Sequence, residues 1–192
     1  FATAIGAVRR PSSATTSATT SHRRRPSLMA PSALALDIDG TITTADQRVV
    51  NDLVAAARAS GAHVAINTAR PPRYCDEPSQ TLHIAAKADH HCYDGASWML
   101  RNFFVDVPAS KVHNMGAIMR DGGVARRECC VLVDDRPENI VAAAEAGYGA
   151  VAVEARAGIT PRHARDILAT LRRCAVDAAR DSPAAFGPQR PA

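Results

Sequence analysis

The stretch ALALDIDGTIT, residues 33–43, decides the fold. Four apolar or small residues lead into two aspartates, Asp37 and Asp39, and then into Gly40 and Thr41. A short apolar run that ends in this way predicts a buried parallel strand, and ligands of open α/β sheets bind at the carboxyl ends of such strands. Two carboxylates this close are costly to bury unless a cation or a proton is shared between them. The stretch therefore predicts a site as well as a strand, with an ordinary Asp/Gly turn as the alternative.

Length and composition indicate a globular domain. The chain has 192 residues, of which 46% are hydrophobic and 22% are charged, enough for one domain with a substantial core. No apolar run approaches the roughly 20 residues that span a bilayer, so we expect no membrane span. The net charge of +4 comes from five arginines near the start; the remaining 18 Lys and Arg face 19 Asp and Glu, or −1. The charge thus does not indicate a nucleic-acid partner.

Composition divides the chain into three parts. Residues 1–32 are rich in Ser, Thr, Ala, Arg and Pro, contain no acidic residue, and are expected to be a disordered tail or an organelle transit peptide. The start at Phe resembles plastid transit peptides, so a plastid location is expected; a cytoplasmic protein with an untargeted tail that starts at Met29 is the alternative. Residues 33–180 are expected to form the domain, and residues 181–192 a second disordered tail.

The cysteines do not form a recognisable framework. There are five of them and no C-x-x-C motif: Cys75, Cys92, Cys129, Cys130 and Cys174. Two are adjacent in an apolar, strand-like run, where a free cysteine behaves as a small hydrophobic residue. We therefore expect free thiols and a reducing compartment.

Apolar periodicity predicts strands and helices in alternation. The expected strands cover about 34–39, 63–69, 129–133 and 150–153, and the expected helices cover 46–60, 109–120, 137–146 and 160–179. Between residues 71 and 110 the pattern is weaker: it suggests a helix over 78–89, a strand or loop over 91–97 and a strand over 102–107. This order predicts an α/β fold, a Rossmann-like three-layer α/β/α sandwich with a mainly parallel sheet.

Polar residues follow three of the expected strands. Asp37 and Asp39 end the first, Thr68 ends the second, and Asp134 and Asp135 end the strand near residue 130. Because the carboxyl ends of parallel strands share one edge of a sheet, we expect these side chains to lie together. Clustered carboxylates need a cation, and oxygen ligands favour Mg²⁺, which proteins often hold together with a substrate phosphate. Phosphate chemistry through an aspartyl-phosphate is the function that this pattern suggests.

Four motifs in order carry a family resemblance. DIDGT, NTAR, a lysine and VLVDDRPEN resemble the haloacid dehalogenase-like (HAD) superfamily of aspartate-nucleophile phosphatases over about residues 33–175. The resemblance implies a Mg²⁺-dependent phosphomonoester hydrolase with Asp37 as the nucleophile. It implies that Asp39 is the general acid and base, with its backbone carbonyl on Mg²⁺, and that Gly40 and Thr41 shape the turn that aims both.

The resemblance also assigns the remaining site residues. Thr68 would hydrogen-bond the transferring phosphoryl group, Asp134 would be a distal Mg²⁺ ligand, and Asp135 a second ligand or an orienter. The implied metal ligands are Asp37, Asp39, Asp134 and Asp135, and the implied substrate-binding residues are Gly40, Thr41, Thr68, Arg70 and Lys111. Arg70 is expected either to touch substrate or to form a structural ion pair.

The catalytic lysine has two candidates. Lys87 and Lys111 are the only lysines in the chain. Lys111 lies 23 residues before Asp134, a spacing that resembles the family. We therefore favour Lys111 as the catalytic lysine, and interpret Lys87 as a solvated charge on a helix.

The segment lengths indicate a member of the family with little or no cap domain. Too few residues separate Thr41 from Thr68 for a cap. Residues 71–110 are short for a second domain, and we expect them to include a core strand and helix instead. An open site implies a phosphorylated small molecule or macromolecule as substrate, and a homo-oligomer or partner subunit could complete the pocket. A non-catalytic binding or regulatory module, a phosphomutase or a dehalogenase are alternatives, and a response-regulator receiver domain fits less well because DxDGT comes first.

Overall fold

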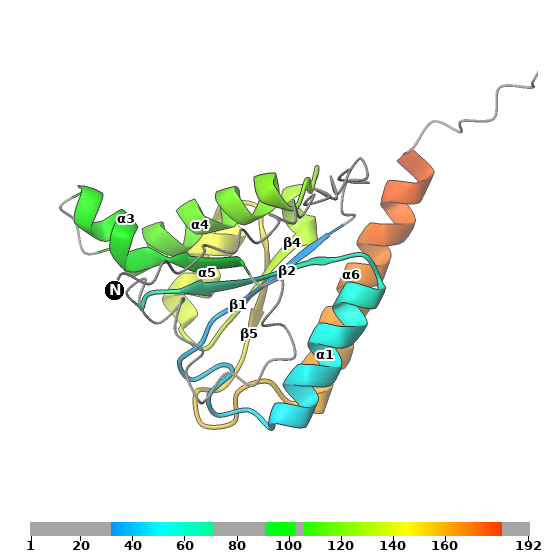
Figure 1. The fold of residues 1–192 in the computed structure, drawn as a ribbon, viewed down its shortest axis with the longest axis horizontal. Coiled ribbons are helices and arrows are strands. Elements are labelled where there is room, and N and C mark those ends of the chain that lie inside the picture. Colours follow the sequence, from blue (N-terminus) through cyan, green and yellow to red (C-terminus); the bar gives the residue numbers. More distant parts are fainter. Residues whose placement is uncertain (1–31, 71–90, 103–105, 182–192) are drawn as a thin grey trace, which may run out of the picture.

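A five-stranded, all-parallel sheet forms the centre of the computed structural model, which describes residues 32–70, 91–102 and 106–181 (Figure 1). The strands lie in the order β3-β2-β1-β4-β5. Their bounds are Ala33–Leu36 (β1), His63–Thr68 (β2), His91–Asp94 (β3), Cys130–Asp134 (β4) and Gly149–Ala152 (β5). The helices are Gln47–Ala59 (α1), Gly95–Asn102 (α3), Val107–Asp121 (α4), Pro137–Glu145 (α5) and Pro161–Asp181 (α6), with a 3₁₀ turn at Arg127–Cys129 (η1).

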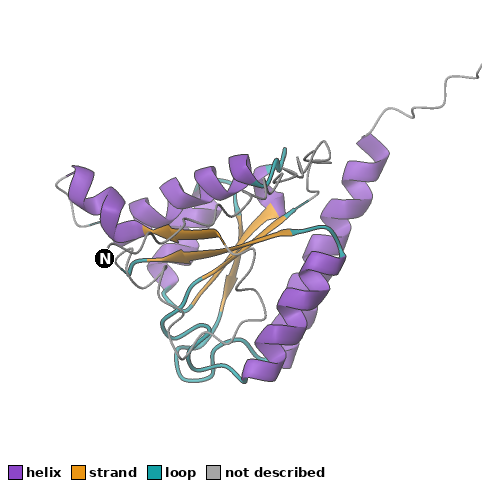
Figure 2. Cartoon of the chain, in the orientation of Figure 1, coloured by secondary structure: helices purple, strands orange, loops and turns teal. Residues whose placement is uncertain are grey.

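Helices cover both faces of the sheet, which makes the fold a Rossmann-like three-layer α/β/α sandwich as predicted (Figure 2). Helices α1 and α6 pack side by side on one face, while α3, α4 and α5 lie on the other (Figure 1). Successive residues of β1 alternate between the two cores: Leu34 and Leu36 face α1 and α6, whereas Ala33 and Ala35 pack with α4 and α5. A strand buried on both faces explains why its sequence is continuously apolar.

Helix α1 forms where the apolar periodicity predicts a helix, and its first residues are capped by a side chain. The Asp46 carboxylate accepts a hydrogen bond from the Arg48 N–H and caps the helix start, as its position predicts. The apolar stripe of the helix, Val50, Leu53, Val54 and Ala57, is buried in the core. Gly61 follows the helix with φ +83°, a left-handed conformation that suits glycine.

Several expected boundaries differ from the structure. β1 ends at Leu36, so Asp37 and Asp39 lie in the turn beyond the strand, although the Asp37 N–H still bonds to the Val133 carbonyl (3.0 Å). Ser32 belongs to the domain, since it is buried and its carbonyl accepts from the His63 N–H. Helix α6 continues to Asp181, one residue into the expected tail.

The structure describes residues 91–102 and 106–110 of the segment in which the sequence pattern is weaker. Residues 91–94 form β3 in parallel with β2, and 95–102 form helix α3 against α4, so this part supplies a core strand and helix as expected. The strand predicted over 102–107 is wrong where the structure describes it: Asn102 ends α3, and Asp106 caps α4 by accepting from the Ala109 N–H. The composition of residues 102–107 favours a strand, but Asp106 caps a helix instead. The predicted helix over 78–89 and both disordered tails, apart from residues 32 and 181, lie outside the described residues.

Within the described ranges, no helix combines the length and the apolarity that crossing a bilayer requires.

A disulfide joins Cys129 to Cys174, which corrects the expectation of free thiols. The two residues are 45 positions apart, and packing of α6 against η1 brings their Cα atoms to 5.7 Å. No local sequence motif predicts this pair, because the distance between the two cysteines depends on how elements far apart in sequence pack. Cys130, next in sequence, points into the sheet core and remains a free, buried thiol whose pKa burial raises to about 12.

Removing this disulfide should destabilise the protein. Loop-closure entropy for a 45-residue separation predicts a loss of about 4 kcal/mol in the free energy of unfolding. Thermal melts with and without a reductant measure the loss, and the double variant Cys129→Ala/Cys174→Ala is the control, since its melt should not respond to reductant. A wild-type melting temperature that is equal in both conditions would refute the disulfide.

Candidate functional site

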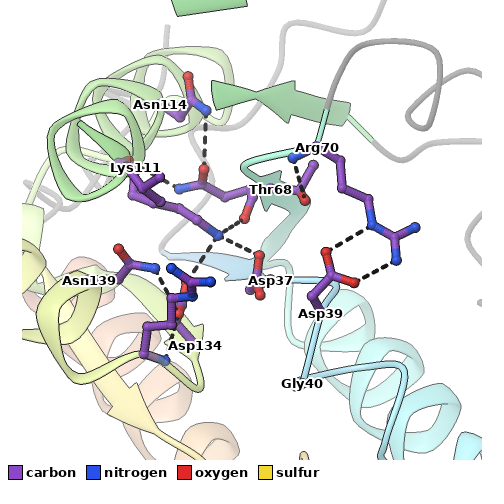
Figure 3. Close-up of polar contacts among 12 residues, drawn as sticks. Asp37, Asp39, Gly40, Thr68, Arg70, Lys111, Asn114, Asp134 and Asn139 are labelled. Carbon is purple, nitrogen blue, oxygen red and sulfur yellow. Dashed lines mark hydrogen bonds and ion pairs between the residues drawn. The ribbon is translucent and has the colours of Figure 1, made fainter. Parts of the chain in front are cut away.

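The expected polar residues gather at one edge of the sheet, as the parallel topology requires (Figure 3). Asp37 follows β1, Thr68 ends β2, and Asp134 ends β4. Lys111 reaches the same edge from α4, which packs across the sheet. The structure thus brings four sequence-predicted residues together from four separate elements.

The Lys111 ammonium is the buried centre of this site. Its side chain is 1% exposed. Nζ donates to Asp37 Oδ1 at 2.5 Å and to the Asn67 carbonyl at 2.5 Å, and lies 3.0 Å from Asp134 Oδ2. A buried ammonium requires such partners, because desolvation without them would neutralise it. The preference for Lys111 as the lysine of the site is thereby supported, while Lys87 lies outside the described residues.

Two asparagines that the sequence reasoning overlooked hold Lys111 in place. Asn67 accepts from Lys111 Nζ through its backbone carbonyl and donates from Nδ2 to the Lys111 carbonyl (3.1 Å). Asn114 in turn donates from Nδ2 to Asn67 Oδ1 (3.1 Å). Asn67 therefore bonds to both the ammonium and the backbone carbonyl of Lys111. The available signal was its place directly before Thr68, since a polar residue in an apolar strand needs buried partners.

Asp134 is fixed by the start of α5. Its Oδ1 accepts from the Arg136 backbone N–H and from Asn139 Nδ2, both at 2.9 Å. Arg136 and Asn139 thereby tie this carboxylate to the first turn of α5. Its Oδ2 is buried and accepts no hydrogen bond from the described residues, although the Lys111 ammonium lies nearby.

Three carboxylates form a group that fits a divalent cation. One oxygen each from Asp37, Asp134 and Asp135 lie within 4.8 Å of one another. The group carries three negative charges against the single charge of Lys111. An all-oxygen donor set that includes a buried oxygen lacking a hydrogen bond suits Mg²⁺ better than softer metals.

Gly40 makes room for Asp135. It adopts φ +71°, and a Cβ built on it would lie 2.5 Å from Asp135 Oδ2. Only glycine combines the left-handed backbone with this close approach. The role assigned to Gly40, shaping the turn beside the aspartates, thus has a specific physical content.

The Asp39 carboxylate lies apart from this acidic group. Both of its oxygens accept from Arg70, Oδ2 from Nε at 2.9 Å and Oδ1 from Nη2 at 2.5 Å (Figure 3). The Asp39 side chain is 63% exposed, and the Arg70 hydrogen bonds, more than any other cause, lower its pKa. The expected structural ion pair of Arg70 is therefore present. The role implied for the Asp39 backbone carbonyl as a metal ligand stays a prediction.

An open pocket of about 190 Å³ adjoins the acidic group. Its described lining residues are Asp37, Asp39, Gly40, Ala69, Val107, Lys111, Asp135, Arg136 and Asn139. Thr41 and Thr68 are fully buried and are not among them, nor is Arg70. Thr41 instead accepts at its carbonyl from the Ile159 N–H, so its observed contact supports the turn, while the Thr68 hydroxyl accepts from the Arg70 N–H (3.2 Å).

Burial raises the pKa of Asp37 from 3.8 to about 6. The Lys111 ammonium opposes this shift, whereas the neighbouring Asp134 charge adds to it. Without a cation, Asp37 is therefore protonated more readily in the folded protein than in the unfolded chain.

Asp37→Asn should stabilise the cation-free protein in a pH-dependent way. The cost of ionised Asp37 is absent below about pH 3.8 and complete above about pH 6, so the variant should exceed wild type by about 1–3 kcal/mol at pH 8 and converge with it near pH 4. Lys111 keeps Asp134 and Asn67 as partners in the variant. Denaturant unfolding with a chelator measures the difference, and a variant less stable than wild type at pH 8 would contradict the expected sign.

Gly40→Ala should weaken cation binding. The new Cβ would displace the Asp135 carboxylate, and a loss of about tenfold or more in Mg²⁺ affinity is expected. Gly147→Ala is the matched control, because Gly147 also has positive φ (+83°) but its Cβ would meet only the Arg127 side chain at 3.8 Å. Calorimetric Mg²⁺ titration compares the two. Equal affinities would show that Asp135 contributes nothing to the cation site.

Comparisons with known proteins bear on the fold. No protein-family model matches the chain, and no curated protein matches it. Among solved structures, the chain is similar to an uncharacterized protein from Corynebacterium glutamicum ATCC 13032 Kitasato, whose crystal structure was determined at 1.44 Å. The TM-score is 0.56 at 23% identity, over 75% of this chain and 96% of that one. This likeness shows a shared α/β fold.

Proposed function

We propose that the protein is a Mg²⁺-dependent phosphomonoester hydrolase of the HAD-like superfamily that works through an aspartyl-phosphate on Asp37. One observation carries the proposal: a buried lysine lies between two aspartates from different strand ends, Asp37 and Asp134. The partners Lys111 and Asp37 are 74 positions apart in sequence. A fold can bury such a group without a functional reason, but Asp37 and Lys111 line the adjoining pocket, which brings them within reach of a ligand.

The chemistry follows from the residues in place. An oxygen of Asp37 attacks phosphorus, the bond from phosphorus to the leaving oxygen breaks, and Asp39, after taking a proton from solvent, donates it to that oxygen. Asp39 then takes a proton from water, which attacks the aspartyl-phosphate, releases inorganic phosphate and restores Asp37. Lys111 balances negative charge beside the nucleophile throughout, and the Thr68 hydroxyl is proposed to bond the transferring group.

The cation would be held by Asp37, Asp134 and Asp135, with the Asp39 carbonyl as a further proposed ligand. When bound, Mg²⁺ neutralises the charge of the carboxylates and of the phosphoryl group that must approach them. The protein's contribution is the arrangement of the oxygens: Asn139 and the Arg136 N–H orient Asp134, and Gly40 admits Asp135.

The substrate is proposed to be a phosphorylated small molecule or macromolecule. The pocket is open, and no capping element covers it among the described residues. A second copy of the chain or another protein is a proposed partner that would complete it. A plastid location, with a cytoplasmic one as the alternative, remains a proposal from the composition of residues 1–32.

Hydrolysis of an aryl phosphate by the full chain tests the function. Release of phosphate should require Mg²⁺, stop with a chelator, and fall more than about a hundredfold in Asp37→Asn, because a covalent nucleophile is lost. Asp46→Asn is the matched control, since asparagine caps a helix as well as aspartate and Asp46 only caps α1. Residual activity of Asp37→Asn near the wild-type level would overturn the nucleophile assignment.

A second measurement separates an inactive site from an incomplete one. Beryllofluoride with Mg²⁺ mimics a phosphoryl group on aspartate and should bind the wild type but not Asp37→Asn. Absence of both hydrolysis and capture would favour the non-catalytic binding module.

A further inference from the structure

The ion pair of Asp39 with Arg70 occupies the residue that the proposed reaction needs as its acid and base. Arg70 donates to both carboxylate oxygens, so the carboxylate faces the guanidinium (Figure 3). Asp37, two residues earlier, instead faces the Lys111 ammonium. To act as an acid Asp39 must carry a proton on one of these oxygens, and such a proton would compete with a hydrogen bond from Arg70.

The pair belongs to the same site as the nucleophile. Asp39 lines the pocket beside Asp37. Arg70 lies two residues beyond Thr68 and donates its backbone N–H to the Thr68 hydroxyl at 3.2 Å. The ion pair thus joins the turn after β1 to the turn after β2, the two chain segments that would flank a phosphoryl group.

The exposure of the Asp39–Arg70 ion pair suits an exchange of partners. Its side chains are 63% and 26% exposed for Asp39 and Arg70, and an ion pair in contact with water contributes little stability. The Lys111–Asp37 contact is the opposite case, since those side chains are 1% and 9% exposed. A competing anion should therefore displace the carboxylate from Arg70 before it disturbs Lys111.

A phosphoryl group is a suitable competitor. The lining residues Asp37, Asp39 and Asp135 carry three negative charges, against two positive charges on Lys111 and Arg136. Lys111 already donates to two acceptors and lies 3.0 Å from the Asp134 carboxylate, and Arg136 lies within 3.7 Å of Glu138. A guanidinium binds two oxygens of a phosphate in the same forked geometry that it uses for a carboxylate.

We infer, resting on the proposed function, that Arg70 exchanges partners during the reaction. In the phosphate-free protein it holds the Asp39 carboxylate at the pocket rim, and when a phosphoryl group enters it binds that group and releases Asp39 for proton transfer. Arg70 is thus a positioning residue for Asp39 and a determinant of phosphate affinity. This combines, in one cycle, the two roles that the sequence left open.

Nuclear magnetic resonance of the arginine Nε–H groups tests the exchange directly. The Arg70 signal is identified as the one missing from Arg70→Lys. Addition of inorganic phosphate to the full chain with saturating Mg²⁺ should shift it, and should shift the Asp39 carboxyl carbon in the same titration. Phosphate binding that leaves both signals in place overturns the exchange alone, whereas no phosphate binding overturns the exchange and the proposed function together.

Variants supply a second readout. Arg70→Gln should raise the Kd for phosphate by roughly tenfold, because a charge-assisted bond is lost, and Arg70→Lys should recover part of the affinity. Arg126→Gln is the matched control: Arg126 pairs with Glu128 and Asp177 far from the pocket-lining residues, so phosphate affinity should not change. If Arg70→Gln lowers the melting temperature but leaves the phosphate Kd unchanged, the role of Arg70 is structural and the inference fails.

Discussion

The buried Lys111 ammonium is the constraint on which the site depends. A charge that is 1% exposed must find acceptors inside the protein, and it finds them on three separate elements: the turn after β1, strand β2 and the end of β4. Those contacts join α4 to the sheet at the ends of the strands. Asn67 also donates to the Lys111 carbonyl, and Asn114 donates to Asn67. Because the ammonium contacts all three oxygens at once, the positions of Asp37 and Asp134 are determined together with that of the lysine.

The same constraint leaves an imbalance of charge. One ammonium faces three carboxylates, and burial, with a smaller contribution from the Asp134 charge, raises the pKa of Asp37. A structure selected for stability alone would have avoided this arrangement, since apolar side chains of similar volume cost less to bury. Local conflict of this kind is typical of functional sites, where an incoming cation or ligand relieves it. We regard this conflict as the physical basis of the proposed Mg²⁺ and phosphate binding.

Rigid and exchangeable contacts are separated in space. The base of the site consists of buried hydrogen bonds around Lys111 and Asp134, which hold the proposed catalytic groups without further ordering cost. The rim holds the more exposed Asp39–Arg70 pair. The disulfide from Cys129 to Cys174 lies at the opposite end of β4 from Asp134, where it joins α6 to the start of that strand. The disulfide thus stabilises the protein away from the edge where the proposed exchange of Arg70 takes place.

By itself the sequence determined the fold class, the sheet edge that carries the site and most of the polar residues on it. These follow from local patterns: apolar runs, a capping aspartate at residue 46, and polar residues directly after strands such as those at Asp37 and Asp134. Only the tertiary structure decided which groups meet. The bonds between Asn67 and Lys111, the Asp39–Arg70 pair and the disulfide depend on side chains far apart in sequence. Such contacts leave no periodic trace, because packing between elements, and not propensity along the chain, sets the distances.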